Sequence, residues 1–531
     1  MMDFKNLICY LLLLANYSLF AQNSNINLVY HEDIEEDCND IWGFVDKNGN
    51  EYAVIGTRSE TRIYSLKDTS DIHLIYSARG ARSVWRDIKY WNNHLYITHD
   101  QDTFGLTIID VTNAPDTFSH TQWKPTLNIG GSNARFLRAH NLFIDNKGFA
   151  YISGHNISKR GVMILDLNQD PNNPVYMSAT NEFYSHDAFV RNDTLFSSEL
   201  SSGFGIYDVT DKSNPLEIGR GRSGRNFTHN AWASPDGKTL FTTDEVASGF
   251  LESYDISDVS NIKFLDRYKT NPGNTRVIPH NTHILGDFAI TSWYTDGVII
   301  NDVSDPANII KVGSYDTYTT ALPASGSLFL GDWGAYPYLP SGLLLVSDIN
   351  NGLFVFQPSY VKGAYLSGTT LVNTNGVIDT LKGSMIKVLD TDIERFGNDG
   401  SYKIGLTPNV DYKIVFSHPE FGSDTVSIAL ESGSTAELNY TFTRISTGIE
   451  DQITDEILLY PNPAQHELIV SSLENKKFSF DLFDRTGQKI TSGRLLDNGS
   501  LDVRALTPGS YYLVLRVDGE KYQIVKTFIK Q

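Results

Sequence analysis

The sequence predicts an all-β protein, a seven-bladed β-propeller followed by two small β-sandwich domains. Three observations lead to this prediction. Aromatic and β-branched residues are common, and Gly and Asn interrupt the chain at short intervals. Helical periodicity is not sustained beyond the N-terminal segment. A short stretch that reads as one strand and a turn recurs seven times, which is the signature of a repeat architecture.

The recurring stretch is an apolar strand that ends in an Asp and a turn. Five clear copies end at Asp110, Asp166, Asp208, Asp255 and Asp302, and weaker copies lie at residues 62–66 and 353–356. Neighbouring copies are 42 to 56 residues apart, which is typical of one propeller blade. The repeats therefore predict a propeller over residues 25–360.

Each repeat has the same internal order of four strands. In the third repeat the strands are expected at residues 140–144, 150–153, 162–167 and 174–178. The seventh repeat has expected strands at residues 328–330, 343–346 and 353–356 but lacks a fourth. Residues 26–30 match the fourth-strand pattern. We therefore expect this N-terminal strand to complete the seventh blade and to remove an exposed sheet edge.

These repeats resemble a known family. The stretch Ile-Ile-Asp-Val-Thr at residues 108–112 resembles the LVIVD repeat. Units such as His186-Asp-Ala and Pro279-His-Asn resemble the choice-of-anchor B family of secreted bacterial proteins. The resemblance covers about residues 25–360 and implies a shared body carried on different C-terminal anchors. It implies no defined biochemical activity.

The N-terminus reads as a secretory signal peptide over residues 1–21. Lys5 supplies the positive charge, residues 7–15 are apolar, and small residues precede an expected cleavage after Ala21. The apolar run is too short to span a membrane, and no transmembrane segment is expected elsewhere.

Cys38 is the one cysteine beyond the signal, so no disulfide framework is expected. The formal net charge of −20 argues against a nucleic-acid partner, which would require a basic surface.

Two further domains are expected after the propeller. Residues 361–445 carry a Gly-Ser-Tyr turn at 400–402 and resemble a carboxypeptidase-regulatory-like, or transthyretin-like, β-sandwich. This unit shows no catalytic constellation, and a spacer or adhesion module is the simplest interpretation. Residues 446–457 read as a polar linker.

The last domain, residues 458–531, carries the most specific motifs in the chain. A Tyr-Pro-Asn-Pro opening at 460–463, a Pro-Gly-Ser-Tyr turn at 508–511 and a lysine near the end follow in order. This arrangement resembles the type A C-terminal sorting domain of the type IX secretion system of Bacteroidetes. The resemblance implies passage through the outer membrane by that secretion machinery, then release or attachment to the cell surface. An ordinary terminal β-sandwich is the alternative.

Polar residues recur where the first strand of each repeat begins. They are Asn39-Asp40, Arg86-Asp87, His140-Asn141, His186-Asp187, His229-Asn230 and His280-Asn281, and the seventh repeat has no match. The ends of the second strands carry His99, Asp100, His155, Glu199, Asp244 and Glu245. First and second strands are antiparallel neighbours, so both sets are expected on one face, around the mouth of the central channel.

Four histidines beside carboxylates have the ligand types for zinc, copper, iron or manganese. The predicted metal ligands are His140, His186, His229 and His280, and Asp87, His99, His155, Asp187, Glu199, Asp244 and Glu245 form a second tier of polar-face residues. The alternative is structural: a repeated His-Asn pair can join blades by satisfying buried backbone groups.

Three functions remain compatible with this pattern. The first is a secreted or surface binding protein whose polar face takes a ligand, a glycan or another protein. The second is a metal-dependent enzyme with a histidine-lined site in the channel. The third is an adhesive or scaffolding protein that needs no site. No catalytic residue is assigned, because neither a phosphate-binding Gly-rich loop nor a Gly-x-Ser-x-Gly motif is present, and a non-enzyme is favoured.

Overall fold

The structure is a computed structural model of the 531-residue chain. It describes residues 23–157, 161–180, 183–320, 327–374, 376–443, 457–472, 477–495, 499–517 and 523–531. The predicted signal peptide, its cleavage at Ala21 and residues 446–456 of the predicted linker lie outside these ranges. The chain divides into two compact units, residues 1–361 and 362–531.

The described residues form strands, turns and loops, and none of them is helical. In the part of the chain that the structure describes, no helix has the length and apolar character needed to cross a membrane. The protein is therefore all-β over the described residues, as the sequence predicts.

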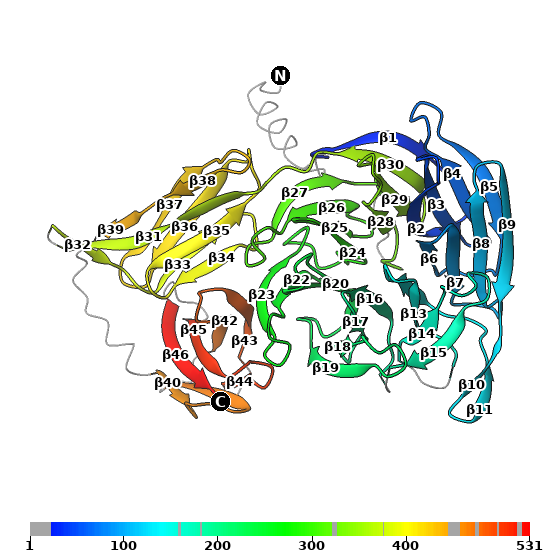
Figure 1. The fold of residues 1–531 in the computed structure, drawn as a ribbon. Coiled ribbons are helices and arrows are strands. Elements are labelled where there is room, and N and C mark those ends of the chain that lie inside the picture. Colours follow the sequence, from blue (N-terminus) through cyan, green and yellow to red (C-terminus); the bar gives the residue numbers. More distant parts are fainter. Residues whose placement is uncertain are drawn as a thin grey trace, which may run out of the picture. The chain divides into compact units, whose positions relative to one another are not determined.

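The first unit consists of seven four-stranded antiparallel sheets, numbered here in chain order (Figure 1). Sheet 1 is β2 (Cys38–Val45), β3 (Glu51–Thr57), β4 (Glu60–Ser65) and β5 (His73–Arg79). Sheet 2 is β6 (Arg86–Trp91), β7 (His94–His99), β8 (Leu106–Asn113) and β9 (Thr117–Trp123). Sheet 3 is β12 (Asn141–Ile144), β13 (Phe149–Ser153), β14 (Met163–Asp166) and β15 (Val175–Ala179). Sheet 4 is β16 (Asp187–Arg191), β17 (Thr194–Ser198), β18 (Phe204–Asp208) and β19 (Leu216–Gly221).

The remaining sheets follow the same order of strands. Sheet 5 is β20 (Thr228–Ala233), β21 (Thr239–Asp244), β22 (Leu251–Asp255) and β23 (Lys263–Tyr268). Sheet 6 is β24 (Thr282–Leu285), β25 (Phe288–Ser292), β26 (Val298–Asp302) and β27 (Ile310–Tyr315). Sheet 7 is β28 (Asp332–Tyr336), β29 (Leu344–Asp348), β30 (Gly352–Pro358) and the N-terminal β1 (Ile26–Glu32). A hairpin of β10 (Thr126–Ile129) and β11 (Ser132–Arg135) lies between sheets 2 and 3.

The repeat read from the sequence is the third strand of every sheet. All seven copies fall on β4, β8, β14, β18, β22, β26 and β30. The expected pairing of the N-terminal strand is confirmed, because β1 runs antiparallel to β30 from Ile26 opposite Pro358 to Glu32 opposite Leu353. The chain start therefore supplies the outer strand of the last sheet.

One expected strand was misplaced. Residues 328–330 were expected to form the first strand of sheet 7, but they lie outside any strand, and β28 begins at Asp332. The sequence Asp332-Trp333-Gly334 resembles a turn, whereas the structure uses it as strand with a bulge between Asp332 and Gly334. A bulge tolerates a residue without a direct cross-strand partner, which explains why the pattern was hidden.

The first strands of the seven sheets contact one another in cyclic order. Each first strand contacts the first strand of the next sheet, and β28 of sheet 7 contacts β2 of sheet 1. The starts of the seven first strands are thereby brought to one common place, although they are far apart in sequence.

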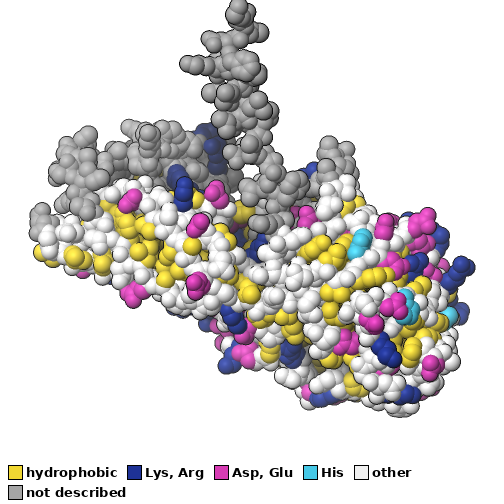
Figure 2. All heavy atoms as spheres, turned by 90° about the horizontal axis from the view of Figure 1, so that it is seen from above, with side chains coloured by type: hydrophobic (Ala, Val, Ile, Leu, Met, Phe, Trp, Pro, Cys, Tyr) yellow, Lys and Arg dark blue, Asp and Glu magenta, His cyan; other side chains and the backbone are white. Residues whose placement is uncertain are grey.

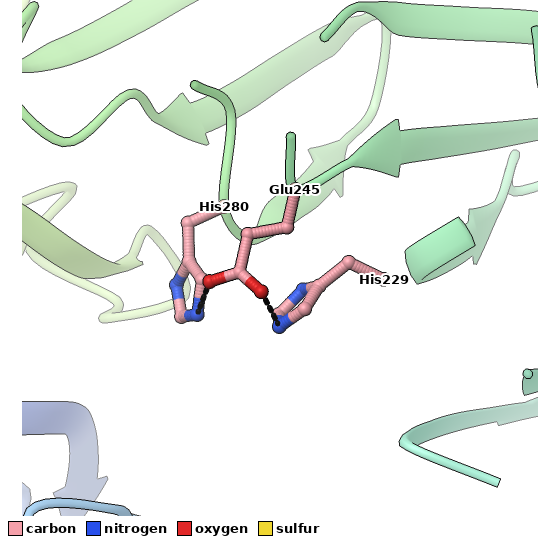
Figure 3. Close-up of side chains that lie close together, drawn as sticks. All are labelled: His229, Glu245 and His280. Atoms are coloured by element: carbon pink, nitrogen blue, oxygen red, sulfur yellow. Dashed lines mark ion pairs between the residues drawn. The ribbon is translucent and has the colours of Figure 1, made fainter. Parts of the chain in front are cut away.

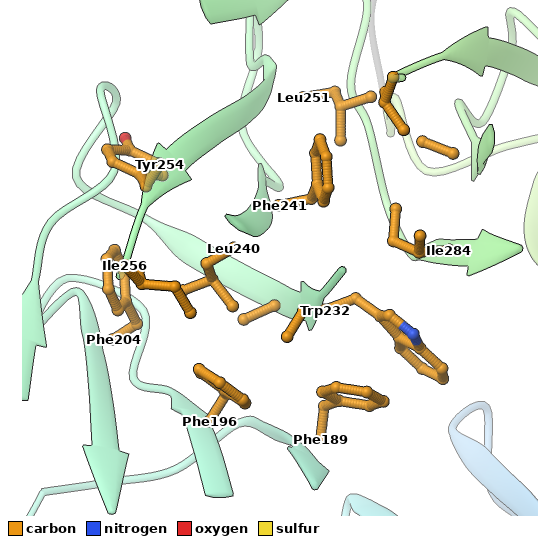
Figure 4. Close-up of a cluster of buried hydrophobic side chains, with 14 of the residues drawn as sticks. Phe189, Phe196, Phe204, Trp232, Leu240, Phe241, Leu251, Tyr254, Ile256 and Ile284 are labelled. Atoms are coloured by element: carbon orange, nitrogen blue, oxygen red, sulfur yellow. The ribbon is translucent and has the colours of Figure 1, made fainter. Parts of the chain in front are cut away.

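Apolar side chains fill the spaces between neighbouring sheets. In the cluster drawn in Figure 4, Phe204 of sheet 4 packs with Leu240 and Tyr254 of sheet 5, and the cluster continues to Ile284 of sheet 6. Phe204 and Leu240 are fully buried. Burying one such side chain contributes roughly 1.5–3 kcal/mol. Because this packing joins one sheet to the next, it fixes the spacing of the first strands.

The second unit contains two pairs of sheets. In the first pair, one sheet is β31 (Ala364–Thr374), β32 (Val377–Thr380), β35 (Ser401–Leu406), β38 (Thr435–Glu437) and β39 (Tyr440–Thr443), and the other is β33 (Ser384–Val388), β34 (Glu394–Gly397), β36 (Tyr412–His418) and β37 (Gly422–Ile428). Both sheets contribute to one core that includes Leu366, Ile386 and Phe416.

The second pair of sheets covers the C-terminal residues. One sheet is β40 (Ile457–Tyr460), β41 (Glu467–Ser472) and β44 (Ser500–Asp502), and the other is β42 (Phe478–Phe483), β43 (Lys489–Arg494), β45 (Gly509–Val517) and β46 (Gln523–Lys530). Their shared core includes Leu468, Leu482 and Leu513. Residues 362–443 and 457–531 therefore each build a separate core.

Charged side chains are spread over the face of the molecule that Figure 2 draws. On the face drawn in Figure 2, acidic and basic side chains are interspersed among polar and apolar ones. On that face, the net charge of −20 is not gathered into one acidic patch.

The pairing of β1 with β30 gives the first prediction. Deletion of residues 23–32 removes the ladder to β30 and the buried Ile26 side chain, so the free energy of unfolding is expected to fall by about 3 kcal/mol or more in chemical denaturation. Leu28→Ala is the matched control, because Leu28 on the same strand is 45% exposed; its effect is expected within about 0.5 kcal/mol. An unchanged unfolding midpoint after the deletion would contradict the role of β1.

Candidate functional site

The second residue of the repeated polar pair joins one sheet to the next in sheets 1, 2, 4 and 5, whereas the buried Oδ1 atoms of Asn141 and Asn281 have no hydrogen-bond partner among the described residues. Asp40 of sheet 1 accepts a hydrogen bond from the backbone N–H of Ile88 in sheet 2 (2.7 Å). Asp87 of sheet 2 accepts in the same way from Leu142 N–H in sheet 3 (2.9 Å). Asn230 of sheet 5 accepts from the backbone of sheet 6. These buried bonds link strands that are about fifty residues apart, as the structural interpretation of the pattern predicted.

The first residue of each pair has a different role. The rings of His140, His186, His229 and His280, from sheets 3 to 6, form a continuous row. Successive ring centroids lie 4.1, 4.4 and 4.5 Å apart. Trp333 of sheet 7 extends the row, with its ring 4.6 Å from that of His280. The sequence expectation that these four imidazoles lie side by side therefore agrees with the geometry.

The backbone holds these histidines in a repeated way. The N–H groups of His140, His186 and His280 each donate to the carbonyl of the serine that ends the second strand of the same sheet. His229 sits instead at a bulge between β20 and β21. His140, His186 and His280 lie one or two residues before the first strand of their sheet and His229 is the second residue of its strand, so all four stand where the first strands begin.

The four histidines line a cavity of about 20 Å³ at the start of the first strands. The other lining residues are Asp40, Trp85, Arg86, Asp87, Asn141, Asp187, Asn281 and Trp333. His229 and His280 are buried, His140 and His186 are half-buried, and Trp85 is 37% exposed. Most of this lining is polar, which suits a single ion.

Two of the histidines have a defined tautomer. Nδ1 of His280 lies 2.5 Å from the carbonyl oxygen of Trp333, and a carbonyl only accepts, so Nδ1 carries the proton. Nδ1 of His140 lies 2.9 Å from a carboxylate oxygen of Asp100 and donates in the same way. The lone pair is therefore on Nε2 in both rings. A hydrogen bond from the ring nitrogen that does not bind the metal is what orients metal-bound histidines in proteins.

Glu245 lies between two of the imidazoles (Figure 3). Its two carboxylate oxygens are 3.4 Å from His229 Nε2 and 3.7 Å from His280 Nε2. The Tyr294 hydroxyl donates to the oxygen that faces His280 (2.5 Å). Burial raises the pKa of Glu245 to about 7. The ligand atoms of His229, Glu245 and His280 all lie within 4.8 Å of one another.

Burial also keeps the imidazoles of His186, His229 and His280 neutral. It lowers the pKa of His280 to about 3 and holds the pKa values of His186 and His229 well below the ordinary range, with the neighbouring histidines adding to the effect. Nδ1 of His186 is buried and has no hydrogen-bond partner among the described residues. Neutral imidazoles are the form that binds metal ions.

A buried ion-pair group lies beside the cavity. The Lys89 ammonium group contacts Asp87, lies 3.7 Å from Asp40, and sits 4.3 Å from the centre of the Trp42 ring. Burial raises the pKa of Asp40 well above its usual value, although Lys89 opposes the shift. The positive charge of Lys89 therefore compensates the negative charges of Asp40 and Asp87, the acidic residues that join the sheets.

Most of the second-tier residues do not reach the histidine row. Nδ1 of His99 accepts from Arg86 (2.5 Å), and its Nε2–H donates to Thr107 (2.7 Å). Nδ1 of His155 accepts from the backbone of the following loop, and burial lowers the pKa of this ring to about 4. Both imidazoles are thus occupied by structural contacts and do not line the cavity.

The acidic second-tier residues divide into two groups. Glu199 forms an ion pair with Arg220, and Asp244 accepts from the backbone of the loop before β20. Neither lines the cavity. Asp87 and Asp187 line it, and Glu245 contacts two of the histidines.

Three contributors were not identified as site residues from the sequence. Trp85, Tyr294 and Trp333 each contact a histidine of the row or Glu245. Trp333 occupies a bulge in β28 as His229 does in β20, so its position relative to the repeat is the one signal that could have revealed it. Tyr294 follows the second strand of sheet 6, where the polar pattern was not sought.

The buried ion-pair group gives the second prediction. Lys89→Met leaves Asp40 and Asp87 without their cation, so the free energy of unfolding is expected to fall by about 3 kcal/mol or more at pH 7. Burial holds the folded-state pKa of Asp40 above its unfolded value of about 4, so the loss should grow as the pH rises from 4 to 7. Denaturant titrations of the wild type and the variant at both pH values check this.

Lys238→Met is the control, because Lys238 is exposed in a hairpin turn. It is expected to change stability by no more than about 0.5 kcal/mol. Equal effects of the two lysine variants would rule out a compensating role for Lys89.

Comparison with known proteins identifies the C-terminal domain. A family model described as the secretion system C-terminal sorting domain matches residues 458–531. No curated protein matches the chain. One similar solved structure is PorZ of Porphyromonas gingivalis, described as an essential surface component of the type-IX secretion system. It is 10% identical with a TM-score of 0.41, and the match covers 94% of this chain and 60% of the PorZ chain.

Another similar structure is the computationally designed protein Ika8, which is 8% identical with a TM-score of 0.41; the match covers 63% of this chain and 99% of that one.

The sorting domain at residues 458–531 marks a protein that engages the secretion machinery and is exported to the cell surface or the extracellular space.

Proposed function

We propose that this protein is an exported binding protein whose ligand is a divalent transition metal ion. The ion is held by the histidine row at the channel mouth of a seven-bladed β-propeller over residues 25–360. The C-terminal sorting domain supplies the export signal, and residues 361–445 act as a spacer.

The propeller assignment is supported by the order of strands and contacts. Seven four-stranded antiparallel sheets follow one another along the chain. Their first strands contact one another in a cycle, and the N-terminal strand supplies the outer strand of the last sheet. A ring of blades joined in this manner leaves no exposed edge at the junction of its two ends.

The metal assignment rests above all on the side-chain arrangement around Glu245. Tetrahedral zinc ligands at 2.0–2.1 Å are about 3.4 Å apart, and the contacts of Glu245 with His229 and His280 measure 3.4 and 3.7 Å. The His280 lone pair is on Nε2, the nitrogen that faces Glu245. Imidazole and carboxylate together suit zinc, copper, iron or nickel.

A metal-dependent enzyme is the second candidate function. His229, Glu245 and His280 are three protein ligands, and catalytic zinc sites use three protein ligands and keep a fourth position for water or substrate. His186, the next ring in the row, would close that position if it also bound the ion. Three protein ligands would therefore favour catalysis, and four would favour binding or storage of the ion.

The metal site gives the third prediction. Protein purified without chelator is expected to contain about one equivalent of zinc or another transition metal by plasma mass spectrometry. A His229→Ala/His280→Ala variant should lose it, because both Nε2 ligands are removed. His73→Ala is the control, since His73 is exposed and outside the row. Chelator should lower the unfolding temperature of the wild type but not of the double variant.

A metal-free wild type whose unfolding temperature is unchanged by added Zn²⁺ would overturn the metal proposal. Equal metal content in wild type and double variant would place the ion elsewhere.

The sorting domain gives the fourth prediction. Deletion of residues 458–531 is expected to leave the protein in the periplasm of a host with a type IX secretion system, because the matched sorting domain is removed. Its separate core should allow residues 23–443 to fold without it. Immunoblots of the medium, surface and periplasmic fractions check this, with the full chain as control. Surface delivery of the truncated chain would contradict the role of the domain.

A further inference from the structure

A second and larger cavity lies at the other ends of the first strands. It has a volume of about 510 Å³ and is lined by Trp91, Phe143, Ile144, Phe189, Val190, Arg191, Trp232, Pro235 and Tyr338, with Asp145, Asn146, Asn192 and Asp193. The histidines stand where the first strands begin, whereas Trp91, Ile144 and Arg191 are the last residues of β6, β12 and β16. The two cavities therefore open at opposite ends of the same strands. Ligand pockets of small molecules typically measure about 300–1000 Å³.

Aromatic rings form one wall of this cavity. The rings of Phe189 and Trp232 are stacked with centroids 4.2 Å apart, and the Tyr338 ring is nearly parallel to that of Trp232 at 6.1 Å. Phe189 and Trp232 lie together at one end of the buried cluster in Figure 4. A wall of parallel rings offers flat apolar faces, which can contact the C–H face of another ring.

The wall also carries a donor without an acceptor. Trp232 is 6% exposed, and its Nε1–H has no hydrogen-bond partner among the described residues. Indole nitrogen only donates, so a buried indole without an acceptor costs roughly 1–3 kcal/mol. A ligand oxygen in the cavity would remove that cost.

Arg191 supplies a positive charge at the same wall. Its guanidinium lies 5.2 Å from the Phe189 ring, and Nη1 donates to the carbonyl of Ala233 (2.9 Å). No carboxylate among the described residues forms an ion pair with it. The two carboxylates of the lining are engaged elsewhere, because Asp145 accepts from its own turn and Asp193 pairs with two lysines. The remaining guanidinium donors are therefore free for an anion.

The rim adds neutral polar groups. Asn146 and Asn192 line the cavity and are exposed. Each amide can both donate and accept, as is required for binding hydroxyl groups. The cavity thus combines ring faces, an unpaired guanidinium, a lone N–H donor and amides.

We propose that this cavity binds an acidic saccharide, a pyranose ring that carries a carboxylate. The apolar face of the sugar stacks on the half-buried Tyr338 ring of this wall, and the carboxylate is held by the Arg191 guanidinium, whose planar fork matches two carboxylate oxygens. A sugar oxygen accepts from Trp232 Nε1–H, and hydroxyls bind the rim amides. The proposal is independent of the metal site, because the two cavities share no lining residue.

The test is a binding titration of the full chain with trigalacturonate. Tryptophan fluorescence reports contact with Trp232, and isothermal calorimetry gives the affinity. Trigalacturonate is expected to bind, and a neutral trisaccharide of the same size, maltotriose, to bind at least tenfold more weakly. Binding should weaken as salt increases, because it depends on a partly exposed ion pair.

Two variants assign the interaction to this wall. Arg191→Met keeps the stem of the side chain and removes the charge, so affinity for trigalacturonate should fall tenfold or more while affinity for maltotriose is unchanged. Trp232→Phe keeps an aromatic ring and removes the N–H, so both sugars should bind several-fold more weakly. His140→Ala, at the opposite cavity, is the matched control and should leave both affinities unchanged.

Unfolding temperatures of the three variants show whether each is folded. If Trp232→Phe does not fold, the affinity of Arg191→Met for trigalacturonate tests the proposal. The proposal is overturned if trigalacturonate does not bind, if it binds no better than maltotriose, or if Arg191→Met retains wild-type affinity. Loss of binding in His140→Ala alone would move the saccharide to the histidine cavity and equally overturn it.

Discussion

The hydrogen bonds between neighbouring first strands are the constraint on which the rest of the first unit depends. A side-chain oxygen of one sheet accepts from the backbone N–H of the next, as Asp40 does from Ile88 and Asp87 from Leu142. These bonds are buried, and leaving one unmade would cost roughly 1–3 kcal/mol. They set the spacing and the register of the strands. The residue before each acceptor is thereby placed where the first strands meet, and in sheet 5, where Asn230 is the acceptor, that residue is His229 of the histidine row.

This arrangement explains why one repeated dipeptide serves both structure and chemistry. The acceptor residue can vary between Asp and Asn because either side chain offers an oxygen, and Lys89 compensates the charge where two acids lie close together. The histidine is not needed for that bond. Its ring is free to face its neighbours, and in His280 and His140 the tautomer is fixed by a carbonyl and a carboxylate. The structural and the metal-binding interpretations of the pattern therefore apply to different residues of the same pair.

The sequence was sufficient for features that repeat or that are local. It placed the third strand of each sheet, the pairing partner of the N-terminal strand and the convergence of four histidines, because apolar alternation and spacing carry that information. It was insufficient where contacts between sheets determine which residues meet and where a strand begins. Glu245 appeared equivalent to Glu199 and Asp244, yet it alone of the three reaches the histidines. The first strand of sheet 7 was misplaced because Asp332-Trp333-Gly334 has the composition of a turn.

The central claim is that His229, Glu245 and His280 share one metal ion. Anomalous X-ray diffraction from crystals of the purified full chain, measured on both sides of the zinc absorption edge, tests it most directly. The account predicts a single anomalous peak about 2.0–2.1 Å from both Nε2 atoms and from a Glu245 oxygen. Density with no anomalous peak at this position, after crystallisation with excess Zn²⁺, would contradict it.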